Sequence, residues 1–179
     1  NGDSKCSATS MAMVLTMNGL IGRDYNTMAA KANEMYPRVL VQGVAYVYKM
    51  RDELRHQGAA SDYHGETTND AWHRLKQEVD SGRPVIVRSA DSIVTAAGHF
   101  MVAVGYRETD NSRLVITYDP YGRWLGTCCT NNYDRNDTTS ISQKGRWVYY
   151  DFATVFGANN YLITASAPTR SAVTGSDHA

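Results

Sequence analysis

A histidine and an aspartate occupy matching places on two stretches of the sequence that predict a β-hairpin. His99 begins one run rich in Val, Phe and Tyr, and Asp119 ends the next such run. The polar stretch 107–113 between the two runs is typical of the turn that joins antiparallel strands. If this turn is centred near Thr109, His99 and Asp119 are directly opposed, with Cβ atoms about 4.5 to 5.5 Å apart. A carboxylate at that distance can hold one nitrogen of the imidazole ring.

A cysteine near the start of the chain supplies a third reactive group. Cys6 opens a segment whose apolar residues recur at the spacing of one helix face, namely Ala8, Met11, Ala12 and Leu15. Asp3 and Ser4 offer N-cap chemistry just ahead of it, which places Cys6 in the first helical turn. A helix N-terminus favours negative charge and lowers the pKa of a thiol, and the thiolate is the nucleophilic form. We therefore predict a reactive cysteine.

These three residues belong to a set of motifs whose order and spacing resemble a known family. The motifs are Cys6 with Thr9-Ser10 and the apolar run 11–15, then Gly82-Arg83-Pro84-Val85-Ile86-Val87, then Gly98-His99, and then Tyr118-Asp119-Pro120-Tyr121-Gly122. From residue 1 to about residue 163, the chain resembles the papain-like bacterial cysteine peptidases related to the bacteriocin double-glycine leader peptidases. The resemblance implies Cys6 as nucleophile, His99 as general base and acid, and Asp119 as the residue that orients His99.

Two positions depart from the pattern of that family. Its members usually have Gly-Pro directly after the nucleophile, where this chain has Ser7-Ala8. Papain-like enzymes also use a glutamine about six residues before the cysteine as one oxyanion donor, and here that position would precede Asn1. Asn1 is the candidate substitute. The alternatives are a glutamine just upstream of it, or a missing donor, which typically lowers the rate about 10²- to 10³-fold.

The mechanism implied by the resemblance needs only these groups. His99 takes the proton of Cys6, the thiolate attacks an amide carbonyl, and backbone N–H groups at the helix start help to hold the oxyanion. His99 then protonates the leaving amine, and water releases the acyl-enzyme. We expect neither a cofactor nor a metal to take part.

The two remaining cysteines, Cys128 and Cys129, are adjacent in the sequence. Ring strain makes a disulfide between neighbours uncommon, so we expect two small, partly buried loop residues and no disulfide framework. A redox or metal role is the alternative, although no Cys-x-x-Cys spacing indicates zinc.

The order of elements predicts an α+β domain. Helices are expected over residues 6–15, 24–36 and 43–56 and from Thr68 or Asn69 to 81, with strands over 84–89, 100–106, 114–119, 145–150 and 161–165. The resemblance implies a papain-like cysteine peptidase fold, with an N-terminal helical lobe that carries the nucleophile helix and a C-terminal antiparallel β-sheet lobe. We assign residues 1–165 to the peptidase domain and 166–179 to a disordered tail or linker.

A long polar stretch, residues 121–144, is a candidate lid on the substrate side. Tyr121 and Trp124 at its start are candidate substrate-binding residues, as is Gly98 beside His99. Ordinary packing at the sheet edge is the alternative role for the two aromatic residues.

The composition limits the class of protein and of partner. A chain of 179 residues with 42% hydrophobic content fits one soluble domain, and 18 basic against 18 acidic side chains give no net charge. With this charge balance we expect no electrostatic binding to nucleic acid or to an anionic membrane. No apolar run in the sequence is long enough to insert into a membrane. We expect a monomer.

The start at Asn1-Gly2-Asp3, without Met or a signal pattern, indicates a processed form or an excised domain.

The expected function is a cysteine-dependent amide hydrolase, and three substrate classes fit it. These are peptidoglycan stem peptides cut by an exported lysin, a leader peptide cut after small residues, and glutamine side chains in deamidation or transglutaminase-like acyl transfer. A peptide bond is favoured, and the polar segment after the domain favours an exported cell-wall enzyme. A catalytically silent peptide-binding module is the alternative from a different class, in case the oxyanion donor is missing.

Overall fold

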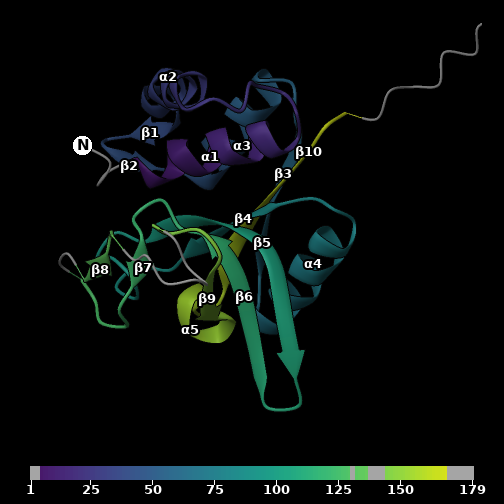
Figure 1. The fold of residues 1–179 in the computed structure, drawn as a ribbon, viewed down its shortest axis with the longest axis vertical. Helices are drawn as coiled ribbons and strands as arrows, with labels where there is room; N and C mark the ends of the chain where they lie inside the picture. The colour runs from purple at the N-terminus through teal and green to yellow at the C-terminus, as the bar shows by residue number, and fades with distance from the viewer. Residues whose placement is uncertain (1–4, 130–131, 137–143, 169–179) are drawn as a thin grey trace, which may run out of the picture.

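The computed structural model describes residues 5–129, 132–136 and 144–168, and its centre is an antiparallel sheet of six strands in the order β3-β10-β4-β5-β6-β9 (Figure 1). The strands are β3 (Ala60–Glu66), β4 (Val85–Ser89), β5 (His99–Thr109), β6 (Ser112–Tyr118), β9 (Val148–Asp151) and β10 (Asn160–Ser166). The helices are α1 (Cys6–Met17), α2 (Tyr25–Met35), the 3-10 helix η2 (Tyr36–Val39), α3 (Val47–His56), α4 (Thr68–Asp80) and α5 (Phe152–Phe156). Two short hairpins complete the described fold, namely β1 (Leu40–Val41) with β2 (Val44–Ala45), and β7 (Arg123–Trp124) with β8 (Tyr133–Asp134).

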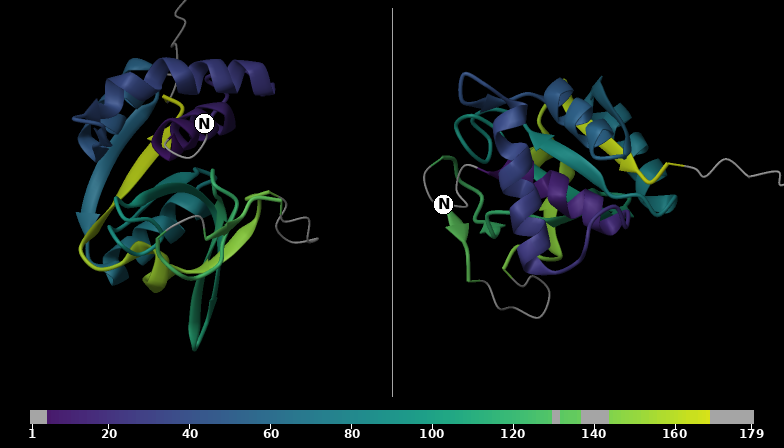
Figure 2. Two further views of the ribbon diagram at one scale, coloured as in Figure 1. Left: turned by 90° about the vertical axis from the view of Figure 1, so that its left-hand side faces the viewer. Right: turned by 90° about the horizontal axis from the view of Figure 1, so that it is seen from above.

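The central strands bury both of their faces, because helices pack on the two sides of the sheet. Phe100 and Val102 of β5 join the core formed with α1, α2 and α3. Met101 and Ala103, the alternate residues, join the core formed with α4 and α5. Figure 2 shows α1 and α2 lying side by side over one side of the sheet. This two-sided burial explains why these strands are continuous apolar runs in the sequence.

The four expected helices are present, with small differences at their starts. Asp24 caps α2 as expected, since its Oδ1 accepts from the backbone N–H of Thr27 at 2.9 Å. The cap of α4 is Thr67, one residue before the expected Thr68 or Asn69. Lys5 is the N-cap of α1, and the expected caps Asp3 and Ser4 lie outside the described residues. Cys6 is nevertheless in the first turn.

Several elements were not expected from the sequence: the β1–β2 and β7–β8 hairpins, the 3-10 helix η2, strand β3 and helix α5. Strand β3 is an edge strand, paired only with β10, and its sequence ASDYHGE lacks the apolar alternation that marks a half-buried strand. It lies between α3 and α4 in the chain, so the helices do not simply precede the strands. Strands β3 and β10 run together up to the helical layer that contains α1 and α3 (Figure 1).

The register of the β5–β6 hairpin differs from the expected one. The strands continue through the polar stretch to the pair Thr109↔Ser112, so the turn is tighter and later than predicted. A bulge between Ala103 and Gly105 then shifts the pairing, and Val102 faces Tyr118. Continued by one residue, this register puts Asp119 opposite Met101, two residues from His99 rather than directly across from it. Without the bulge, Asp119 would fall opposite Val102 and project to the other face of the sheet.

The C-terminal strand β10 ends at Ser166, one residue beyond the expected domain boundary. The expected tail lies outside the described residues from 169 onward. Within the part of the chain that the structure describes, no helix is both long and apolar enough to cross a membrane.

Candidate active site

Cys6 is the first residue of α1, and its thiol is half-buried against the start of β5. Burial by itself would raise the pKa of this thiol. The hydrogen bond and the charge of His99, the backbone N–H of Phe100 and the hydroxyl of Tyr121 act in the opposite direction, and the pKa of Cys6 is lowered overall. The surroundings of Cys6 therefore favour the thiolate, which is the nucleophilic form.

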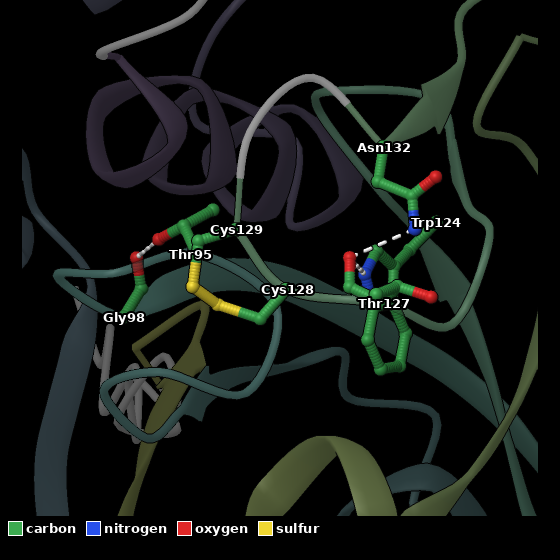
Figure 3. Close-up of a disulfide and its surroundings, with 7 residues drawn as sticks. All are labelled: Thr95, Gly98, Trp124, Thr127, Cys128, Cys129 and Asn132. Atoms are coloured by element: carbon green, nitrogen blue, oxygen red, sulfur yellow. Dashed lines mark hydrogen bonds between the residues drawn. A yellow bond between two sulfur atoms is a disulfide. The ribbon is translucent and has the colours of Figure 1, made fainter.

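His99 is the first residue of β5, and its side chain is fully buried. Gly98 before it has φ +82°, and a Cβ at that position would lie 2.9 Å from the carbonyl oxygen of Ser89. The turn that delivers His99 thus requires glycine. The hydroxyl of Thr95 donates to the carbonyl of Gly98 and closes the turn (Figure 3).

Asp119 directly follows β6 and receives three hydrogen bonds on its buried carboxylate. Its Oδ1 accepts from Nε2 of His99 at 2.7 Å and from the backbone N–H of Tyr121 at 3.0 Å. Its Oδ2 accepts from the hydroxyl of Tyr150 at 2.8 Å. The backbone is held as well, because the N–H of Asp119 donates to the carbonyl of Gly145 at 2.7 Å.

The pair formed by His99 and Asp119 sets the protonation state of the imidazole. Burial alone would lower the pKa of His99. The negative charge of Asp119, the hydrogen bond to it and the neighbouring Cys6 raise that pKa to about 10. Nε2 is engaged by Asp119, so Nδ1, which has no hydrogen-bond partner among the described residues, is the nitrogen left for the thiol. The geometry favours an imidazolium next to a thiolate.

Aromatic rings enclose this imidazole. The ring of Tyr121 packs on His99 with centroids 4.4 Å apart, and the ring of Tyr133 meets it edge-on at 5.8 Å. Rings in these positions keep water from the charged pair and strengthen its electrostatic attraction.

A cavity of about 250 Å³ opens beside Cys6. Its apolar wall comes from the β1–β2 region and from β5, with the side chains of Leu40, Val44, Ala45 and Phe100. Two of the expected substrate-binding residues, Gly98 and Tyr121, also line it. Trp124 does not, and its ring packs instead on Tyr150, with centroids 6.3 Å apart. Asn1, the expected oxyanion donor, lies outside the described residues.

Sequence reasoning missed Tyr150, whose hydroxyl contacts the carboxylate of Asp119. One signal was present: β9 alternates buried Val148 and Tyr150 with exposed Tyr149 and Asp151. A tyrosine on the buried face of a strand usually needs a partner for its O–H. The identity of that partner depends on the pairing of β9 with β6, which the sequence does not show.

The structure pairs Cys128 with Cys129, with their sulfur atoms in contact (Figure 3), a pairing that the sequence analysis treated as uncommon. Their side chains turn toward each other on the loop after β7, near Thr95 (Figure 3). The only other cysteine, Cys6, is a free thiol within the site and is no competing partner.

The comparisons with known proteins bear on the family and the fold of this chain. A profile of the Peptidase_C39 like family matches residues 1–155. The chain is similar to the crystal structure of the peptidase domain of Streptococcus ComA, a bifunctional ABC transporter involved in a quorum-sensing pathway, with 13% identity, a TM-score of 0.53 and 93% of each chain covered. It is also similar to a putative C39-like peptidase from Bacillus anthracis, with 13% identity, a TM-score of 0.52 and coverage of 94% of this chain and 91% of that one.

A search among curated proteins finds no match. At 13% identity the two solved structures establish the fold alone, and both are C39 peptidase folds. The family profile covers most of the chain and confirms the resemblance found in the sequence motifs. The chain therefore belongs to the Peptidase_C39 like family and has its papain-like cysteine peptidase fold.

Proposed function

We propose that this protein is a cysteine peptidase that cleaves peptide bonds with Cys6, His99 and Asp119. One observation carries the proposal: a buried, hydrogen-bonded pair of His99 and Asp119 lies beside a thiol at a helix N-terminus. The lowered pKa of that thiol and the raised pKa of the imidazole both favour the reactive ion pair. A structural cysteine in an apolar core would have its pKa raised instead.

Each group has a defined step in the reaction. The thiolate of Cys6 attacks the carbonyl carbon, and the imidazolium of His99 donates its proton to the leaving amine as the C–N bond breaks. His99, now neutral, takes a proton from water as its oxygen attacks the thioester, and the C–S bond then breaks to release the acid and regenerate the thiolate beside the imidazolium. Asp119 keeps the imidazole oriented through both steps.

The first turn of α1 supplies donors for the oxyanion. The first backbone N–H groups of any helix have no partner within the helix, and the N-cap residue Lys5 contributes no side-chain acceptor to them. Among the described residues no side chain caps these N–H groups, which lie next to Cys6 and can bind a carbonyl oxygen that becomes negative. Asn1 or a residue upstream of it would add a second donor.

The cavity beside the nucleophile supports a peptide substrate. Its apolar wall suits a peptide that carries an aliphatic side chain close to the scissile bond, as stem peptides and leader peptides both can. Deamidation or acyl transfer at glutamine is less favoured, because an amide side chain would gain little from that wall.

Alkylation of Cys6 tests the proposal without any guess about the substrate. Iodoacetamide labelling is followed by mass spectrometry from pH 4 to pH 10 in the wild type, in His99→Ala and in His73→Ala as the control. His73 is an exposed histidine of α4, so its removal should change nothing. We expect fast labelling of Cys6 well below the ordinary thiol pKa of about 8.5, and loss of this reactivity only in His99→Ala.

Equal profiles for wild type and His99→Ala would contradict the proposal and favour the silent peptide-binding module. If the labelling of Cys6 does depend on His99, peptides and peptidoglycan are tested next as substrates, with Cys6→Ala as the inactive reference.

A further inference from the structure

We propose that Tyr150 is a positioning residue of this site, whose hydroxyl fixes the carboxylate of Asp119 and thereby orients His99 toward Cys6. The inference rests on the proposed function and adds a fourth side chain to it. Tyr150 belongs to β9, the edge strand beside β6, and is 6% exposed. It lies far from the other three residues in sequence, and none of the motifs noted above contains it.

The direction of the hydrogen bonds fixes where the phenol proton goes. The oxygen of Tyr150 accepts from the backbone N–H of Trp124 at 2.8 Å. The hydroxyl proton must therefore go to another acceptor, and Oδ2 of Asp119 lies 2.8 Å away. The carbonyl of Gly122 is the alternative at 3.5 Å, which is too long to compete. The backbone of β7 thus aims the hydroxyl of Tyr150 at Asp119.

The position of Asp119 in the fold explains why its carboxylate needs the hydrogen bond from Tyr150. Asp119 lies just beyond the last residue of β6, so strand pairing with β5 no longer restrains it. The hydroxyl of Tyr150 holds Oδ2, while the N–H of Tyr121 and Nε2 of His99 share Oδ1. With both oxygens engaged, the carboxylate cannot turn, and its Oδ1 stays in line with the imidazole.

Tyr150 can fill this role at any pH at which the site works. Burial and the charge of Asp119 raise the pKa of its phenol far above the ordinary value, so it remains a neutral donor. A phenol that never ionises does not exchange protons with the substrate. Its contribution is orientation, which separates it from the residues that contact the reacting atoms.

The test compares Tyr150→Phe with Tyr106→Phe. Both variants delete one tyrosine hydroxyl that donates to a carboxylate at 2.8 Å, but Tyr106 bonds Asp80 at the surface. The readouts are the pH midpoint of Cys6 alkylation, and kcat and KM on a cleaved peptide. For Tyr150→Phe we expect the midpoint to rise toward the ordinary thiol value of about 8.5, with kcat about tenfold lower and KM unchanged. Tyr106→Phe should match the wild type in every readout.

A double-mutant cycle makes the result independent of any loss of stability. If Tyr150 acts through Asp119, adding Tyr150→Phe to Asp119→Ala should change neither the midpoint nor kcat, whatever its effect alone. Circular dichroism confirms that each measurement is made on folded protein. An additive effect, or an unchanged midpoint in folded Tyr150→Phe, would overturn the inference. This failure differs from failure of the proposed function, in which the midpoint would be indifferent to His99→Ala.

Discussion

The nucleophile and its acid–base partners reach the same site by different routes. Cys6 depends on one helix, and the residues that make α1 a helix lie within 12 consecutive positions. The His99–Asp119 pair depends on three strands, a bulge in β5 and a contact from β9. The side of the site that carries Cys6 therefore depends on local sequence and should tolerate small shifts of the backbone. The side that carries His99 and Asp119 depends on contacts between distant segments and should be sensitive to such shifts. This difference can be tested by changes made on each side.

The largest effect is expected from a substitution in the backbone that holds Asp119. Gly145 has φ +87°, and a Cβ there would lie 2.1 Å from the carbonyl oxygen of Asp119. Gly145→Ala should lower the free energy of unfolding by about 3 kcal/mol or more and abolish activity. Gly82→Ala is the matched control, because its φ of +74° is similar but nothing lies within 4 Å of the added Cβ.

Urea unfolding and alkylation of Cys6 measure both variants. Gly82→Ala should lose only about 1 kcal/mol, the ordinary strain of a side chain in the left-handed region. If the two variants were equally stable and equally reactive, the backbone around Asp119 would tolerate a side chain as well as the open turn at Gly82 does, contrary to the sensitivity expected of the sheet side.

The second effect is a dependence on pH that arises from His99. Its pKa is about 10 in the folded protein against about 6.5 in an unfolded chain. A pKa raised by folding stabilises the protein fully below about pH 6.5, and this contribution is lost as the pH rises toward 10. The difference in unfolding free energy between wild type and His99→Gln should therefore be larger at pH 6 than at pH 10. If this difference in unfolding free energy were the same at pH 6 and pH 10, the folded site would contain no imidazolium stabilised by Asp119.

Activity should follow the same pair of groups. The thiolate and the imidazolium coexist above the lowered pKa of Cys6 and below the raised pKa of His99, which is about 10. A plot of kcat/KM against pH should show a plateau between these limits. In His99→Ala the plateau should disappear, and the rate that remains should rise with an ordinary thiol pKa of about 8.5.

A smaller effect is expected on the helix side, at the cavity wall. Val44 lines the cavity and is 46% exposed, so a charge there can be solvated without unfolding the protein. Val44→Asp should raise KM for an apolar peptide about tenfold and leave kcat and the alkylation of Cys6 unchanged. Val41→Asp, in the same hairpin but outside the cavity, is the control. Equal values of KM for the two variants would mean that the cavity does not bind substrate.

The smallest effect concerns the count of reactive thiols. If Cys128 and Cys129 form the disulfide in which the structure pairs them, iodoacetamide should add one label to the folded, unreduced protein and three after denaturation and reduction. Intact-mass spectrometry measures this directly. Three labels without reduction would contradict the disulfide, and the alkylation of Cys6 would then have to be followed on individual peptides.

The sequence alone determined the local half of this protein. Periodicity and capping predicted α1, α2, α3 and α4, because a helix is built from contacts three and four residues apart. The apolar runs of β4, β5 and β6 marked the central strands, and four motifs in order along the sequence indicated the family that the profile then confirms. Cys6, His99 and Asp119 were selected in this way, and their catalytic roles stay predictions until alkylation tests them.

The way in which the strands pair depends on contacts between distant parts of the chain. The bulge that places Asp119 on the same face as His99, the edge position of β3, and the hydroxyl that reaches Asp119 from β9 all depend on pairing between segments distant in the chain. Strand pairing carries no short-range signature in the sequence, and a shift of one residue reverses the face of every side chain. For this reason the expected direct opposition of His99 and Asp119 was wrong in register, although the hydrogen bond between the two is present.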